Sequence, residues 1–194
     1  MSRLKPLKPE EMNELQLQYY QLIRQREVFN NLPKKAPLEG PYNAWIRSPE
    51  MIRSLVSYSQ YLTGEGILEK RLMELAIITV GRVWSAEFEF AAHAPKALES
   101  GIDPEVVDAI SRNDTPRFEK ADEAAVYAFT MELTGSRRVS DDVYQTVVDQ
   151  LGEQGVVELV GLAGLYGMVC MTLNTFEVPL MKGMPAPFPE AEPV

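Results

Sequence analysis

Residues 71–93 of the chain read RLMELAIITVGRVWSAEFEFAAH, and this stretch predicts two consecutive helices joined by a short turn. The first helix spans residues 68–83, where apolar side chains recur at helical spacing at Leu68, Leu72, Leu75, Ala76 and Thr79. The second spans residues 85–100 and ends at Gly101, a residue type that commonly follows a helix. No alternating strand pattern longer than a few residues occurs, so the fold class is expected to be all-α.

The fourteen prolines extend this interpretation to the rest of the chain. None lies between Pro49 and Pro95 or between Pro116 and Pro179, so long helices can run there. Residues 31–47, with three prolines, are expected to be irregular. Besides the two helices above, we expect helices over residues 9–30, 49–62, 104–111, 121–133, 141–151 and 153–175.

The domain organisation follows from this layout. The 194 residues suit one compact multi-helix bundle. We assign it to residues 1–183, counting residues 1 to about 47 as an N-terminal extension. Residues 184–194 are proline-rich and are expected to form a flexible tail.

Composition excludes several function classes. Nineteen Lys and Arg against 28 Asp and Glu give a net charge of −9, which argues against nucleic acid or an anionic membrane as a partner. The longest mostly apolar stretch, residues 156–169, is shorter than the roughly 20 residues of a membrane span. The first residues lack the pattern of a secretory signal, and a single cysteine, Cys170, excludes an internal disulfide. We therefore expect a cytoplasmic protein.

The last helix predicts an oligomer. It is the most hydrophobic of the chain, and one copy is not expected to bury all of it. Gly161, Gly164 and Gly167 are spaced by three residues, which permits close approach of a partner helix. We expect a homo-oligomer.

Glu89 and His93 are the main catalytic candidates. They lie four residues apart on one helix, so their side chains share a face and can hydrogen-bond. A carboxylate beside an imidazole is the minimal unit of general acid–base catalysis. The small residues Ala86 and Ala97 are expected to leave open space beside the pair. A surface Glu–His pair or a satisfied core histidine is the structural alternative.

Glu74 and Arg82 add to this cluster. Glu74 is surrounded by apolar residues, where a carboxylate is costly unless it is paired. Arg82, eight residues on, is expected on roughly the same face, where it could pair with Glu74 or bind an anionic substrate. A structural ion pair between helices explains both residues equally well.

Three aromatic residues complete the candidate site. Trp84, Tyr42 and Trp45 are expected to contribute to substrate binding, although aromatic residues near helix ends often only pack. The single histidine argues against a metal site as the main chemistry, yet Glu74, Glu89 and His93 together could in principle ligate iron or zinc.

The stretch from Leu68 to Gly101 resembles the carboxymuconolactone decarboxylase family, which includes the alkylhydroperoxidase D-like proteins. The resemblance rests on the Arg-x-x-Glu-Leu-Ala run that begins at Arg71, the Glu-Phe ahead of His93, and then Ala97 and Gly101. It implies an alkylhydroperoxidase D-like all-helical bundle that commonly forms trimers or hexamers.

The family's peroxidase branch carries Cys-x-x-Cys-x-x-x-His, with a glutamate on the preceding helix. On this chain the histidine falls on His93 and that glutamate on Glu74, while the two cysteine positions hold Ala86 and Glu89. Both thiols are therefore missing, and thiol-dependent peroxide reduction through a disulfide is excluded.

The resemblance that remains is to the decarboxylase branch, which is cofactor-free. It implies His93 as proton donor or shuttle and Glu89 as the group that sets its tautomer and basicity. Glu74 would be a second acid–base group or the other partner of His93. Arg82 would hold a substrate carboxylate or stabilise developing enolate charge. The expected ligand is a small carboxylated lactone or related carbonyl compound, with no cofactor and no metal. Two alternatives stay open: a non-catalytic helical oligomer that binds a ligand or partner protein, and a metal-dependent oxidative enzyme.

Overall fold

The computed structural model describes residues 2–25, 33 and 35–189, and over these residues the chain is helical with no β-strand. The all-α prediction is confirmed. The main helices are α1 (Glu14–Ile23), α2 (Tyr42–Trp45), α3 (Pro49–Gln60), α4 (Lys70–Val83), α5 (Glu87–Glu99), α6 (Pro104–Arg112), α7 (Ala121–Met131) and α8 (Asp141–Thr175). A 3₁₀ turn, Pro9–Glu11, precedes α1, and π-helical turns follow α3 (Tyr61–Glu65) and α7 (Glu132–Ser136).

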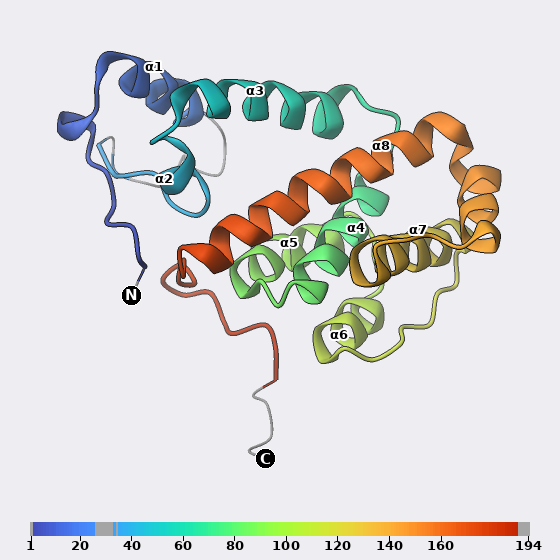
Figure 1. Cartoon of the computed structure of the whole chain (residues 1–194). Helices are drawn as coiled ribbons and strands as arrows, with labels where there is room; N and C mark the ends of the chain where they lie inside the picture. Colours follow the sequence, from blue (N-terminus) through green and yellow to red (C-terminus); the bar gives the residue numbers. More distant parts are fainter. Residues whose placement is uncertain (1, 26–32, 34, 190–194) are drawn as a thin grey trace.

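Helix α4 is the centre of the bundle. All ten of its residues from Leu72 to Gly81 are buried, and the helix packs against α5, α7 and α8 (Figure 1). A helix that is apolar on every side is stable only when neighbours surround it. Glu74 lies inside this buried run, so its carboxylate must be paired within the protein.

Helices α4 and α5 are joined by a tight turn and cross closely. Ser85 adopts a left-handed conformation (φ +49°) that reverses the chain between them. At Gly81 a Cβ atom would lie 3.3 Å from the backbone nitrogen of Phe90, so glycine permits the close approach of the two helices. This crossing brings α5 across the face of α4 that carries Glu74.

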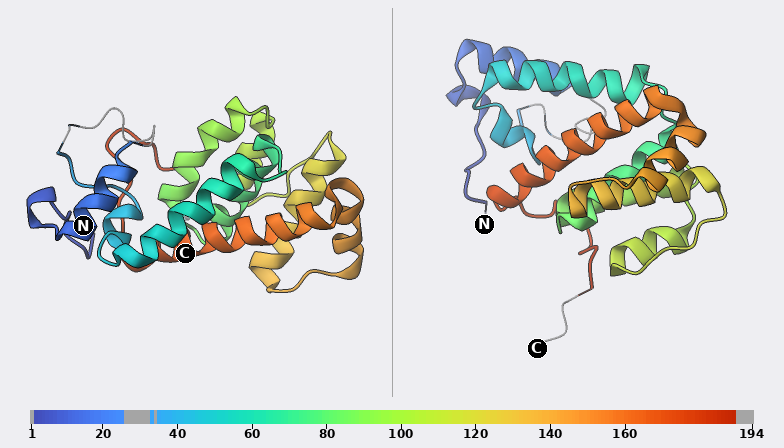
Figure 2. Two further views of the ribbon diagram at one scale, coloured as in Figure 1. Left: turned by 90° about the horizontal axis from the view of Figure 1, so that it is seen from above. Right: turned by 45° about the vertical axis from the view of Figure 1, so that its right-hand side comes forward.

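The N-terminal extension forms a layer against the bundle. Figures 1 and 2 show α1 and α2 of the extension together at one end of the molecule, while α3, which follows the extension, runs from there over α8. A second apolar cluster joins the layers, with Ile23, Trp45 and Val56 on one side and Phe88 and Leu173 on the other. The extension is therefore part of the packed structure.

The N-terminal elements differ from the sequence prediction in two places. The expected helix over residues 9–30 is a 3₁₀ turn followed by α1, and its last part, 26–30, lies outside the described residues. The segment 31–47, expected to be irregular, contains the short helix α2. Burial of Trp45 in the second cluster supplies the tertiary stabilisation that so short a helix needs.

Helix α8 consists of two arms. Gly152 has a non-helical conformation (φ 69°, ψ 171°), which confirms the predicted separation of residues 141–151 from 153–175. By length and composition α8 could cross a membrane, but 56% of its most apolar window is buried inside the protein. Contacts with α4 and α7 show that it is used as a core helix.

The proline-rich tail, expected to be flexible, is docked onto the bundle over its described part. The ring of Phe188 packs edge-on against Phe90, with ring centroids 5.1 Å apart, and the Ser111 hydroxyl donates to the carbonyl of Pro187. The contact between the Phe188 and Phe90 rings stabilises the position of this segment against α5. Residues 190–194 of the predicted tail lie outside the described residues.

Candidate functional site

The three predicted catalytic residues meet between α4 and α5. The His93 Nδ1 atom lies 2.6 Å from Oε2 of Glu74, and the His93 Nε2 atom lies 3.2 Å from Oε1 of Glu89. All three residues are less than a tenth exposed. Their placement follows from the sequence features noted above: helical spacing on α5 joins Glu89 to His93, and the α4–α5 crossing adds Glu74.

The two carboxylates occupy opposite edges of the imidazole and have different effects on it. An ionised Glu74 can only accept a hydrogen bond, so a neutral His93 carries its proton on Nδ1 and donates it to Glu74. The Nε2 atom of that tautomer is a free base that faces Glu89. Glu74 thus fixes the tautomer, a role the sequence analysis had given to Glu89.

Burial determines the state of Glu89. Removal from water raises the pKa of the Glu89 carboxyl, and the nearby Glu74 carboxylate raises it further. His93 and Lys96 act in the opposite direction on the same pKa. A protonated Glu89 can donate to Nε2 of His93, so the two side chains form a unit that can hold and pass one proton.

This unit opens onto a cavity of about 720 Å³. Ligand sites for small molecules commonly measure about 300–1,000 Å³ and are lined mainly by apolar side chains. The cavity walls come from α2 and the loop before it, α3, α5 and α8, and consist of Gln25, Pro41, Tyr42, Trp45, Leu55, Val56, Ser59, Phe88, Glu89, Ala92, His93, Lys96, Leu165, Tyr166 and Val169. Glu89 and His93 are therefore accessible to a ligand, whereas Glu74 is not part of the wall.

Two of the predicted binding residues, Tyr42 and Trp45, line this cavity. The Trp45 Nε1 atom donates to the Thr172 hydroxyl at 3.0 Å, which anchors α2 to α8. The rings of Tyr42 and Trp45 meet edge to face, with centroids 5.6 Å apart. Together they form a fixed aromatic wall.

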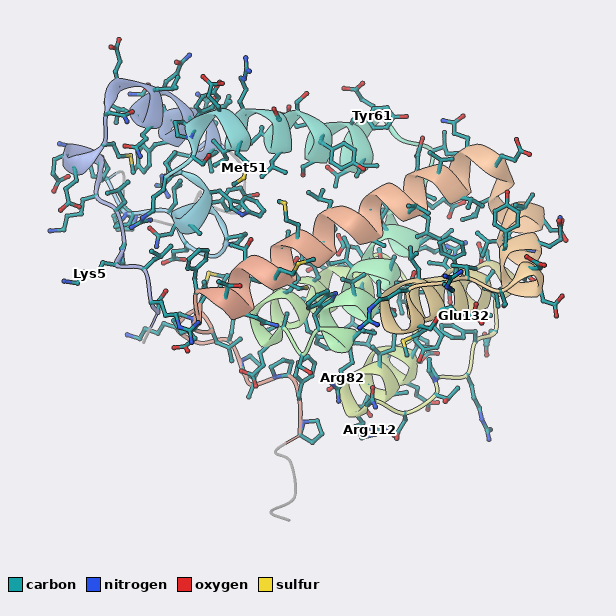
Figure 3. The ribbon with its side chains drawn as sticks, in the orientation of Figure 1. Lys5, Met51, Tyr61, Arg82, Arg112 and Glu132 are labelled. Atoms are coloured by element: carbon teal, nitrogen blue, oxygen red, sulfur yellow. The ribbon has the colours of Figure 1, made fainter. Side chains whose placement is uncertain are left out.

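The other two predicted binding residues lie elsewhere. The Arg82 Nε atom donates to the carbonyl of Ser111 at 3.1 Å, and its guanidinium lies 4.7 Å from the centre of the Phe188 ring. Figure 3 shows Arg82 on the side of α6 and the C-terminal tail, away from α3. Trp84, about a third exposed, ends α4, and its carbonyl accepts from Asn174.

The prediction that Arg82 lies on the same face of α4 as Glu74 is wrong for a geometric reason. Eight residues of α-helix advance by two full turns and about 80° more, so Arg82 and Glu74 point to different sides of α4. The expected open space beside Ala86 and Ala97 is also absent, because both side chains are packed in the core. The cavity lies instead on the face of α5 that carries Ala92 and His93.

Among the cavity residues that sequence reasoning missed are Tyr166 and Lys96, which lie close to His93. The Tyr166 ring meets the imidazole of His93 edge to face at 5.3 Å, and it comes from a helix 73 positions further along the sequence. Lys96 follows His93 by three residues, so helical spacing alone could have placed it on the same face.

Neither a metal site nor a reactive thiol is formed in the described part of the chain. No three His, Cys, Asp or Glu side chains converge there in a way that could hold a metal ion, because Glu74 and Glu89 bind opposite edges of the same ring. Cys170 is fully buried against Ala86 and Ala163. Burial and the neighbouring Glu89 carboxylate raise the pKa of its thiol, which keeps it protonated.

Solved structures confirm the fold. The chain is 12% identical to an uncharacterised peroxidase-related protein with an alkylhydroperoxidase AhpD core from Ralstonia eutropha JMP134, with 94% of each chain covered and a TM-score of 0.73. It is 13% identical to the debrominase Bmp8, in a cysteine-to-alanine variant bound to 2,3,4-tribromopyrrole, with 96% of each chain covered and a TM-score of 0.72.

A third similar structure is a protein of unknown function from Agrobacterium tumefaciens, suggested to be the antioxidant defence protein AhpD. It is 17% identical, with 71% of this chain and 95% of that chain covered and a TM-score of 0.63. No curated protein sequence matches the chain. These likenesses establish the shared architecture.

The family follows from the sequence between α3 and the end of α7. Residues 49–132 match the model of the carboxymuconolactone decarboxylase family, and this segment contains Glu74, Glu89 and His93. Helices α2 and α8, which supply much of the cavity wall, lie outside the matched residues. Residues 49–132 thus match the carboxymuconolactone decarboxylase family, and the chain as a whole has an AhpD-like all-helical fold.

Proposed function

We propose that this protein is a cofactor-free lyase or isomerase that acts on a small carboxylated lactone or related carbonyl compound. One observation carries the proposal: Glu89 and Nε2 of His93 face an apolar cavity, while Glu74 holds the other ring nitrogen at 2.6 Å. A buried acid paired with an oriented base is suited to moving a proton to or from carbon.

The decarboxylation of a lactone acid illustrates the proposed chemistry. The bond between ring carbon and carboxylate breaks, CO₂ leaves, and the electron pair moves into the unsaturated lactone as a dienolate. The Glu89–His93 unit then gives its proton to carbon, which shifts the double bond, and regains one from water. Glu74 keeps the proton of Nδ1 in place throughout, so that Nε2 remains the exchanging atom.

The absent cysteines separate this proposal from the chemistry of thiol-dependent relatives. Ala86 and Glu89 occupy the two cysteine positions of the peroxidase pattern, and Cys170 is buried. An acid–base reaction needs neither thiol. The debrominase neighbour binds 2,3,4-tribromopyrrole, a small unsaturated ring of the size class that we propose for this cavity.

The test is turnover of carboxymuconolactone and related unsaturated lactone acids, followed by release of CO₂ and loss of ultraviolet absorbance. We expect His93→Gln to reduce kcat by about 10²- to 10⁴-fold, the range of general acid–base catalysis, with the fold retained. Glu69→Gln, on an exposed side chain at the start of α4, is the matched control and should keep full activity. Turnover that survives His93→Gln would refute the mechanism.

A non-catalytic role is the second candidate, because a cavity of about 720 Å³ suits a small ligand whether or not that ligand reacts. Such a protein would bind a small unsaturated acid saturably but release no product. The absence of turnover with the whole lactone series, together with tight binding of one of its members, would establish this function and reject the lyase.

We also propose that the protein is a homo-oligomer, a trimer or hexamer. Val157, Val160 and Met171, three large apolar residues of α8, are 71%, 45% and 47% exposed. A second copy of the chain is the partner that would cover this surface.

A further inference from the structure

Among the described residues that line the cavity, Lys96 is the one lysine or arginine. It lies on α5, three residues after His93, so the two side chains leave the same face of the helix with their Cβ atoms about 5–6 Å apart. Its side chain is half-buried. The cavity wall thus carries a cationic side chain about one helical turn from the acid–base unit.

The ammonium group of Lys96 forms no ion pair in the described part of the chain, although it is near enough to Glu89 to lower the pKa of that carboxyl. No carboxylate there lies within ion-pair distance of it, whereas Lys120 pairs with Glu123 and Arg71 pairs with Asp122 and Glu123. An ammonium group without an ion-pair partner, in a wall whose other residues are mostly apolar, carries a desolvation cost that an anionic ligand would offset.

The negative net charge of the whole protein makes this cation more important for the binding of an anion. At a net charge of −9 the molecule repels anions, and the nearest acidic group in the cavity, Glu89, would add to that repulsion when ionised. An anionic ligand therefore needs a local positive charge in order to enter. With Arg82 engaged by Ser111 and Phe188, Lys96 is the residue that can supply it.

We propose that Lys96 forms an anion subsite that binds the carboxylate of a small unsaturated or aromatic acid, with the ring of that acid against Trp45 and Phe88. The short distance between Lys96 and His93 along α5 would then place the carbon skeleton beside Nε2. The orientation relative to His93 rests on the proposed function, whereas the anion subsite itself does not.

Lys96 also has a structural role to consider, since a lysine in the last turn of a helix complements the helix dipole. That role predicts a small loss of thermal stability in any charge-removing variant and no effect on ligand choice. Discrimination between a charged and a neutral ligand is the property that separates the two roles.

The experiment uses Trp45 as the reporter. The chain has two tryptophans, and only Trp45 lines the cavity, so a Trp84→Phe background confines the fluorescence signal to the site. Benzoate and benzamide are the probes, because they share size and ring but differ in charge. Lys96→Met keeps the aliphatic stem without the charge, Lys96→Arg keeps the charge, and Lys70→Met repeats the first change on an exposed lysine outside the cavity.

We expect benzoate to bind at least about tenfold more tightly than benzamide, as a charged hydrogen bond provides. Lys96→Met should remove this preference, while Lys96→Arg and Lys70→Met should retain it. Equal affinities in the parent protein, a preference that survives Lys96→Met, or no saturable benzoate binding would each overturn the proposal. Because the readout is binding, loss of turnover in the His93 test leaves this result unaffected, and the reverse also holds.

Discussion

Replacement of Glu74 by glutamine tests the geometry on which the site depends. The Glu74–His93 contact is 2.6 Å long, and both side chains are only about a tenth exposed, so solvent screens it little. A hydrogen bond to a charged group contributes about 1.5–3 kcal/mol, against about 0.5–1.5 kcal/mol for a neutral one. Glutamine can still accept from Nδ1, so we expect Glu74→Gln to lower the free energy of unfolding by about 1–2 kcal/mol.

Thermal unfolding measures this loss. For a chain of this size each kcal/mol shifts Tm by about 2–4 °C, which predicts a decrease of roughly 2–8 °C for Glu74→Gln. Glu74→Ala should cost more than Glu74→Gln, because it also leaves the buried N–H of His93 without a partner, at about 1–3 kcal/mol. Glu69→Gln, which removes an ion pair to Arg71 from a 68% exposed side chain, is the control and should change stability by less than about 1 kcal/mol.

Nuclear magnetic resonance of the imidazole nitrogens gives the second readout. His93 is the single histidine, so a chain without a histidine tag shows one unambiguous set of signals. We expect the neutral ring to carry its proton on Nδ1 in the parent protein. A proton on Nε2 instead, or a Glu74→Gln variant as stable as the parent, would refute the assignment of Glu74 as the group that fixes the tautomer.

Two further predictions concern Glu89 and α8. Burial raises the pKa of Glu89, so the folded protein holds a proton there that the unfolded chain has released, and folding becomes less favourable as pH rises from about 4.3 through the raised pKa. Glu89→Gln should therefore gain stability relative to the parent as pH rises over that range in thermal unfolding, and a constant difference would contradict this. Val160→Lys, on the exposed face of α8, should reduce the oligomer mass measured by light scattering, whereas an unchanged mass would place the interface elsewhere.

The proposed specificity depends on parts of the chain outside the family match. Tyr42 and Trp45 come before residue 49, and Leu165, Tyr166 and Val169 come after residue 132. These residues form much of the cavity wall, and the Tyr166 ring contacts His93 directly. Relatives that share residues 49–132 can thus keep the same proton-transfer unit and bind a different ring.

The sequence by itself determined the local features of the site. The i,i+4 spacing placed Glu89 against His93, and a carboxylate in a run of buried residues marked Glu74 as paired. Both inferences depend only on helix geometry and on the cost of burying a charge, which act over a few residues. The same helix geometry separates Arg82 from the face of α4 that carries Glu74, and it places Lys96 on the face of α5 that carries His93.

Only the tertiary structure decided which side of α5 is open. The cavity exists because α2, α3 and α8 meet α5 there, and these contacts join residues far apart in the sequence. Side-chain periodicity indicates which face of a helix is apolar. It does not indicate whether neighbouring side chains fill the space on that face or leave a cavity there. Ala86 and Ala97 are packed in the core, whereas Ala92 lines the cavity. The difference arises because the helices that pack on each face of α5 leave different volumes unfilled.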